Sequence, residues 1–155
     1  MKITIIAVGK LKERFWREAV AEYMKRLQAY ADVRIVEIAD RDSDKLPDER
    51  VLEQEGADII KAIPAGSYAV LLDIGGKPLS SPALAEKIAE LGLHGTSSVT
   101  FIVGGSLGVE AAVRANVQDM VSFGAITLPH NLARVVLVEQ IYRAFRINRG
   151  EPYHK

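Results

Sequence analysis

The sequence contains no cysteine, and this absence excludes several kinds of chemistry. Disulfide bonds, thiolate metal sites and cysteine nucleophiles are all impossible in this chain. Histidine is scarce too: the three residues His94, His130 and His154 stand far apart, without the spacing of a metal site. We therefore expect no bound metal and no thiol chemistry.

Long apolar segments are missing as well. No stretch approaches the roughly 20 apolar residues that span a bilayer, and the N-terminal MKITIIAVGK lacks the cleavage site of a signal peptide. We therefore expect a cytoplasmic protein with no membrane partner. A length of 155 residues, with 48 % hydrophobic and 26 % charged residues, is typical of one globular domain spanning 1–155.

A charge of one sign is not in excess, because 20 basic residues balance 20 acidic ones. The distribution is nevertheless uneven, with nine acidic and three basic residues between 37 and 58. Basic residues predominate in 134–155, and a second basic group comprises Lys10, Lys12, Arg14 and Arg17. Such asymmetry permits a local nucleic-acid site on a neutral protein, although solvated helix faces would give the same pattern.

The periodicity of apolar residues predicts strands that alternate with helices. Strands are expected at 2–8, 33–38, 67–73, 98–103 and 118–123, and helices at about 11–30, 48–62, 81–93, 109–116 and 131–147. Ser81 is the expected N-cap of the helix at 81–93, with Pro82 at its first position. Because the inner strands are apolar throughout, we predict an α/β fold with a mostly parallel sheet and helices on both faces.

Three predicted strands end in unusual loops, LLDIGGKPLS, FIVGGSLG and SFGAITLPH. Ligands of open α/β sheets bind beyond the carboxyl ends of the strands. Neither the G-x-G-x-x-G fingerprint nor a phosphate-binding P-loop is present, which disfavours a nucleotide held through its phosphates. The remaining alternatives are a ligand held by backbone groups and three plain turns. Asp73 either orients such a ligand or closes the turn at Gly75.

Longer motifs carry a resemblance to a known family. LDIGGKPLSSPALA, FIVGGSLG, SFGAITLPHNLARVVLVEQIYRAFRI and the terminal PYHK resemble the SPOUT methyltransferase superfamily, and within it the ribosomal large-subunit methyltransferase H family. That family uses S-adenosylmethionine to methylate N3 of a pseudouridine in 23S rRNA. The resemblance runs over the whole chain and implies a C-terminal trefoil knot. It also implies a homodimer that packs through the last helix and acts on rRNA in the large subunit or the whole ribosome.

The resemblance also assigns site residues. The matching motifs imply that S-adenosylmethionine contacts Leu72, Gly105, Gly124, Ala125, Ile126, Thr127, Leu128 and Pro129. They place Tyr153 and His154 nearest the target base, although a frayed tail would be the plain alternative. The family tail ends in Tyr-His-Arg, whereas this chain ends in Lys155, which lacks the bidentate guanidinium.

Four further residues, on the last helix, are candidates for contact with RNA or the partner subunit. His130 is a third catalytic candidate that, like Arg134, reaches RNA or the partner subunit; alternatively, His130 caps the last helix. Arg143 and Arg146 form a solvated or dimer-facing charge row, or contact phosphates. Two rival functions also remain at this point. One is a flavodoxin-like module that holds a nucleotide or flavin, and the other is a ribosome-associated factor with a degenerate cofactor pocket.

Overall fold

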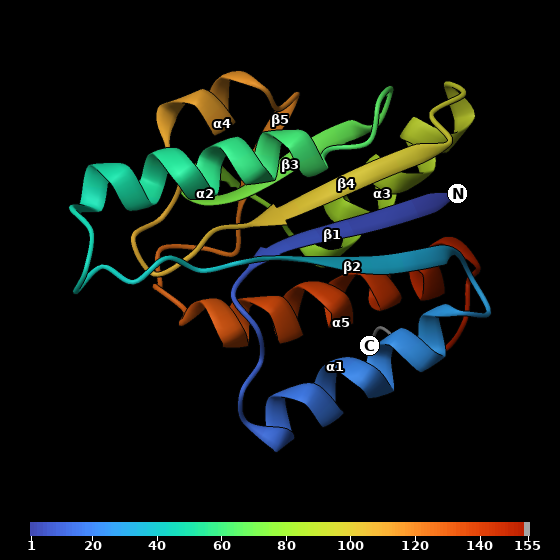
Figure 1. Ribbon diagram of the computed structural model, residues 1–155. Coiled ribbons are helices and arrows are strands. Elements are labelled where there is room, and N and C mark those ends of the chain that lie inside the picture. Colours follow the sequence, from blue (N-terminus) through green and yellow to red (C-terminus); the bar gives the residue numbers. More distant parts are fainter. Residues whose placement is uncertain (154–155) are drawn as a thin grey trace.

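The protein is an α/β structure in which strands and helices alternate along the chain (Figure 1). This computed structural model describes residues 1–153. The elements in chain order are β1 (Lys2–Val8), α1 (Arg14–Leu27), β2 (Asp32–Ile38), α2 (Asp48–Ala62), β3 (Tyr68–Pro78), α3 (Ser81–Leu93), β4 (Ser98–Val103), α4 (Ala111–Ala115), β5 (Asp119–Ser122) and α5 (His130–Asn148).

The strands form one five-stranded sheet in the order β2-β1-β4-β3-β5. Every pair is parallel, so the carboxyl ends of all strands meet at one edge of the sheet. Apolar side chains of the central strands alternate between the two faces, because successive residues of a strand point to opposite sides. Ile3 and Ile5 join one core cluster, and Ile6 and Val8 join the other.

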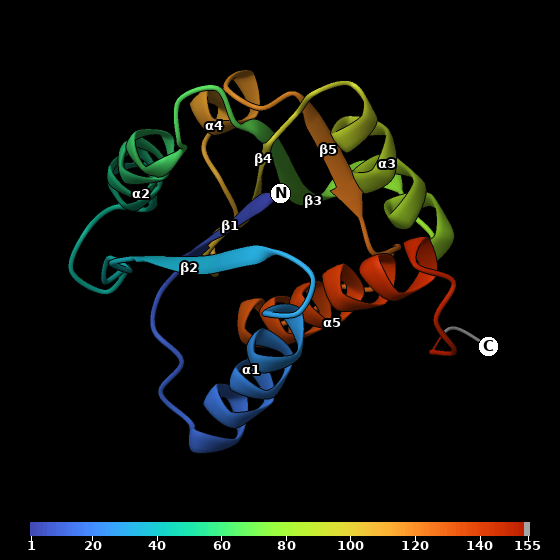
Figure 2. The same ribbon diagram turned by 90° about the vertical axis from the view of Figure 1, so that its right-hand side faces the viewer.

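Helices cover both faces of the sheet, as the sequence predicts (Figure 2). Helices α1, α3 and α5 pack on one face, around a core that includes Leu27, Leu84 and Ile141. Helices α2 and α4 cover the opposite face through Ile59 and Val113. No helix of residues 1–153 is long and apolar enough to cross a membrane.

The boundaries of the elements agree with the sequence-based prediction, with specific differences. Helix α1 starts at Arg14 rather than near residue 11, because the guanidinium of Arg17 donates to the carbonyls of Leu11 and Lys12 outside the helix. The predicted N-cap Ser81 is wrong. Ser80 is the N-cap, and its Oγ accepts from Ala83 N–H at 3.2 Å, which makes Ser81 the first helical residue. The trefoil knot stays a prediction.

Strand β3 is longer than predicted and passes through the two glycines that resemble a turn. Its first part pairs with β5 up to Leu72, and after a register shift Lys77 and Pro78 pair with the same strand. A Cβ on Gly76 would lie 2.7 Å from the backbone of Val121, so only glycine permits this approach. The extension positions Asp73 and Ile74 at the carboxyl edge of the sheet.

Candidate functional site

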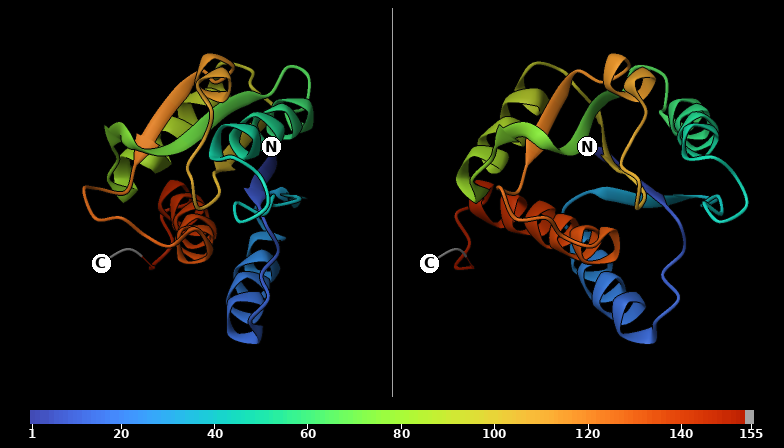
Figure 3. Two further views of the ribbon diagram at one scale, coloured as in Figure 1. Left: turned by 60° about the vertical axis from the view of Figure 1, so that its left-hand side comes forward. Right: turned by 90° about the vertical axis from the view of Figure 1, so that its left-hand side faces the viewer.

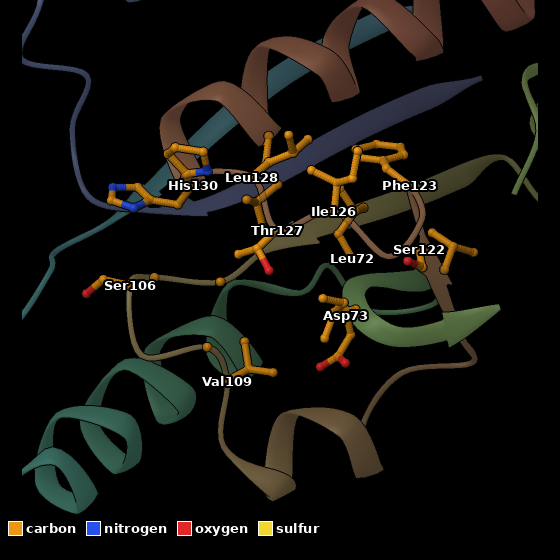
Figure 4. Close-up of a pocket in the computed structure, with 18 of the residues that line it drawn as sticks. Leu72, Asp73, Ser106, Val109, Ser122, Phe123, Ile126, Thr127, Leu128 and His130 are labelled. Carbon is orange, nitrogen blue, oxygen red and sulfur yellow. The ribbon is translucent and has the colours of Figure 1, made fainter. Parts of the chain in front are cut away.

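A cavity of about 620 Å³ opens at the carboxyl edge of the sheet, beyond β3, β4 and β5. The right-hand panel of Figure 3 looks at this edge, where the segment after β4 and the segment entering α5 come together. The cavity is lined by the three loops that the sequence singled out (Figure 4). Its size lies within the range of ordinary small-molecule sites.

The loop after β4 turns sharply to form one wall of the cavity. Gly108 has φ +83, and its N–H donates to Gly105 O at 3.1 Å. A Cβ on Gly104 would come within 2.8 Å of Val109. Gly105 is packed closely against Glu55 and Val8, because a Cβ there would lie 3.1 Å from both Glu55 Oε2 and Val8. Glycine is therefore required here both for the turn and for close packing.

The segment after β5 forms a second wall. Gly124 has φ +116, and its N–H donates to Ser122 Oγ at 3.1 Å. Ile126 is 80 % exposed and stands at the cavity with Thr127 and Leu128, as Figure 4 shows. An apolar side chain left this exposed beside a cavity favours a ligand with an apolar face.

Asp73 and Arg114 form the ion pair of the cavity wall. Arg114 Nη2 lies 2.7 Å from Asp73 Oδ2, and Gly75 N–H donates to Asp73 Oδ1 at 2.8 Å. Burial raises the pKa of Asp73, but the Gly75 hydrogen bond and the Arg114 guanidinium outweigh burial and hold the pKa below its ordinary value. Asp73 thus closes the turn, as one interpretation expected, and also lines the cavity. Sequence reasoning missed Arg114, which lies 41 residues away.

His130 is the first residue of α5 and lines the cavity. Helix α5 has no side-chain hydrogen bond at its N-cap, Pro129, so the capping interpretation of His130 finds no support. Figure 4 shows the imidazole at the start of α5, pointing away from Leu128 and Thr127, on the side of the cavity opposite Asp73. The side chain is half-buried, and nothing in residues 1–153 forms a hydrogen bond with it.

Most of the residues assigned to the cofactor line this cavity, namely Leu72, Gly105, Gly124, Ile126, Thr127, Leu128 and Pro129. Ala125 is the exception: it is exposed and lies outside the lining. His154 and Lys155 lie outside the described residues.

Tyr153 does not reach the cavity of its own chain. It docks on the middle of α5, where its hydroxyl donates to Glu139 Oε1 at 3.1 Å and its ring lies 4.7 Å below the Arg143 guanidinium. Glu139 is nine residues beyond His130, or about 14 Å along the helix axis. Burial raises the pKa of Tyr153, and hydrogen bonds with Tyr23 and Glu139 raise it further. Tyr153 is therefore a docked, protonated phenol rather than a frayed tail.

Arg134 is buried, which corrects the expectation that it reaches RNA. Its side chain is 1 % exposed, with Nη1 at 2.8 Å from Glu37 Oε1 and Nη2 at 2.8 Å from Gly9 O. Burial lowers the pKa of the guanidinium, and Glu37 opposes that shift. Arg134 therefore ties the start of α5 to the ends of β1 and β2. Of the charge row, Arg143 pairs with Glu139 and Arg146 with Glu151.

Comparisons with known proteins agree with this geometry. The family model described as "Predicted SPOUT methyltransferase" matches residues 1–154. The chain belongs to the SPOUT methyltransferase family. Similar proteins named "Ribosomal RNA large subunit methyltransferase H" occur in Lactobacillus acidophilus (48 % identity), Listeria monocytogenes (49 %) and Bifidobacterium adolescentis (49 %), each match covering 100 % of both chains.

The cavity of this SPOUT methyltransferase is lined by few charged side chains. Within residues 1–153, no cluster of three His, Cys, Asp or Glu side chains could hold a metal ion. Glycine loops, apolar side chains and the Asp73–Arg114 pair make up most of the walls. The polar side chains of the lining are those of Asp73, Ser106, Arg114, Ser122, Thr127 and His130, and the other lining residues offer a ligand only backbone N–H and C=O groups.

Proposed function

We propose that this SPOUT methyltransferase transfers a methyl group from S-adenosylmethionine to N3 of a pseudouridine in 23S rRNA, in the cytoplasm. The observation that carries the proposal is the cavity that three glycine-containing loops build at the carboxyl edge of the sheet. The names of the full-length relatives support rRNA of the large subunit as the substrate class.

The residues of the cavity fit S-adenosylmethionine. Gly105 and most of the segment 124–129 line the cavity and would offer backbone groups to the edge of an adenine, and Ile126 would offer an apolar contact for its face. The cofactor carries no phosphate, which agrees with the missing phosphate loop. When bound, it supplies an activated methyl group on a sulfonium cation, so the protein mainly needs to align the acceptor.

The acceptor must also lose a proton, because N3 of a uracil-type base is an imide nitrogen. His130 is a half-buried imidazole at the cavity wall, with no hydrogen bond in residues 1–153. A neutral imidazole accepts a proton near physiological pH, whereas Tyr153 is kept protonated by its raised pKa. We assign His130 to accept the N3 proton and Tyr153, with His154, to position the base.

The proposal includes a homodimer joined through α5. Leu132 and Val136, one turn apart on α5, are half-buried but belong to neither core cluster. The row continues to Glu139 and Arg143, which hold Tyr153. If two α5 helices pack antiparallel along this row, the tail of one copy lies beside the cavity of the other. This arrangement accounts for a tail residue that is far from its own cavity.

Calorimetry with S-adenosylhomocysteine tests the cofactor assignment. Ile126→Gln removes an exposed apolar contact at the cavity, and we expect it to weaken binding roughly fivefold. Leu93→Gln is the matched control, because Leu93 is 85 % exposed and lies outside the cavity. Absence of binding to the wild-type protein would refute the assignment. A purified protein that carries a flavin instead would favour the flavodoxin-like alternative.

Mass spectrometry of rRNA tests the reaction itself. We expect 23S rRNA from cells lacking this protein to lose one N3-methylpseudouridine, which the purified enzyme restores on isolated ribosomes. Unchanged rRNA, combined with ribosome binding, would identify a factor with a degenerate pocket.

Mixing two inactive variants tests the shared site. A chain lacking residues 152–155 and a chain with His130→Ala should each lose activity. The mixture should regain activity, because a mixed dimer carries one complete site. Full activity of the truncated chain alone contradicts the role of the tail.

A further inference from the structure

A second feature follows β1, on the segment that connects β1 to α1 and on the first turn of α1. Residues 10–17, KLKERFWR, carry four cations and one carboxylate, Glu13. Lys10, Lys12 and Arg14 are exposed. The two lysines form no ion pair and no side-chain hydrogen bond with any residue in 1–153. Their charges are therefore available to an external anion.

An aromatic ring stands among these cations. Phe15 is 61 % exposed, although phenylalanine is among the residue types most often buried. Its ring rests against Trp16, with the centroids 4.7 Å apart and the planes at 55°. The Phe15 ring thus contacts a second ring at a tilt, while much of its surface remains in water. Exposed aromatic rings interleaved with cations are the feature on which single-stranded nucleic acids stack.

The basic segment borders a groove of about 440 Å³ that adjoins the first turns of α5. Lys10, Arg17 and Arg134 are the cations that line the groove, against the single carboxylate of Glu37. Arg134 Nη2 holds the carbonyl of Gly9, directly before Lys10, and Arg134 Nε is buried without a hydrogen-bond partner. Because Arg134 is buried and paired with Glu37, Lys10 and Arg17 give the groove its net positive charge.

The groove and the cofactor cavity share one helical turn. His130 lines the cavity and Arg134 lines the groove, at positions i and i+4 of α5. Side chains at this spacing lie about 6 Å apart on one helix face. Figure 1 shows the β1–α1 connection leaving the same edge of the sheet at which α5 begins. An RNA with one base in the cavity could thus extend along the groove toward residues 10–17.

We infer that residues 10–17 form an rRNA-binding surface, in which Lys10 and Lys12 contact phosphates and Phe15 stacks on an unpaired base of the same RNA. The inference rests on the proposed function, since it names where that substrate docks. A whole-molecule charge of zero is compatible with it, because phosphate contacts act locally.

Binding of the full-length protein to ribosomes from cells that lack it tests the lysines. We expect Lys10→Ala/Lys12→Ala to weaken binding about tenfold and to lower the slope of log affinity against log salt by about 1 to 2. Lys25→Ala/Lys61→Ala removes two other exposed lysines and should leave both quantities unchanged. Equal effects of the two double variants would overturn the inference, because only net charge would then matter.

Variants of Phe15 test the stacking contact separately from the phosphate contacts. Phe15→Ala should weaken ribosome binding about fivefold or more without changing the salt slope, and Phe15→Trp should restore it. Affinity for S-adenosylhomocysteine should stay unchanged in every variant, which also reports correct folding. If Phe15→Ala instead shifts the sedimentation of the protein to a smaller species, the ring covers a second copy of the chain and the inference fails.

The outcomes separate this inference from the proposed function. Wild-type protein that methylates rRNA, with variants that keep its KM for ribosomes, overturns the surface alone. Wild-type protein that binds S-adenosylhomocysteine but not ribosomes overturns the surface together with the assigned substrate. A rise in KM with unchanged kcat in the lysine and Phe15 variants supports both.

Discussion

Replacing Arg134 by methionine tests whether one buried guanidinium fixes the start of α5. Methionine has similar length and no charge, so the change removes the contacts to Glu37 and Gly9 and little volume. Hydrogen bonds to charged groups contribute about 1.5–3 kcal/mol each. Glu37 is 36 % exposed and can be rehydrated, and the unpartnered Nε already lowers the net gain. We therefore expect the free energy of unfolding to fall by about 2–4 kcal/mol.

Calorimetric melting measures this loss directly. For a chain of this size, 1 kcal/mol corresponds to about 2–4 °C, so Tm should drop by about 4–16 °C. Arg26→Met is the matched control, because its pair with Glu22 is exposed and screened by solvent, so its loss should change Tm little. If Arg134→Met and Arg26→Met melt within about 1 °C of each other, the buried guanidinium does not fasten α5.

Three further predictions concern the loops and the tail. Gly76→Ala should cost about 1–3 kcal/mol of stability by pushing β3 away from Val121, whereas Gly75→Ala, whose Cβ would meet only Asp73 at 3.2 Å, should cost less; equal melting of the two variants would contradict this. The lowered pKa of Asp73 means that its stabilising contribution is present above about pH 4 and is lost as the pH falls, so Asp73→Asn and wild type should converge in Tm at low pH. Because the pKa of Tyr153 is raised, its contribution to the free energy of unfolding is present below about pH 10 and is lost above it. A tyrosine absorbance titration should show one phenol that ionises at higher pH than the others, and Tyr153→Phe should remove it.

Local sequence signals were sufficient for most of the elements. Helix α2 begins after Pro47 and helix α3 carries Pro82 in its first turn, and both predicted ranges, 48–62 and 81–93, are confirmed. The extension of β3 was missed because Gly75 and Gly76 have the composition of a turn. For Gly76 the actual cause is the close backbone of Val121, which lies in another strand. A tertiary contact of this kind leaves no periodic signal.

The same distinction applies to the candidate site. The three loops were found because each follows a strand, and parallel strands end at one edge. Arg114 and Arg134 were not predicted in their present roles, because their partners are distant in sequence. Arg134 meets Gly9 and Glu37 at separations of 125 and 97 residues. Charge alone suggested RNA contact for Arg134, whereas burial decides against it.

The shared first turn of α5 also links two binding equilibria. His130 faces the cofactor cavity, and Arg134 holds the end of β1 and lines the groove beside residues 10–17. Any ligand that changes the position of this turn alters both sites. Thermodynamic reciprocity then requires that the factor by which a ribosome changes cofactor affinity equals the factor by which the cofactor changes ribosome affinity. If the first turn of α5 does not move, that factor equals one, so a measurement of the factor shows how rigid this turn is.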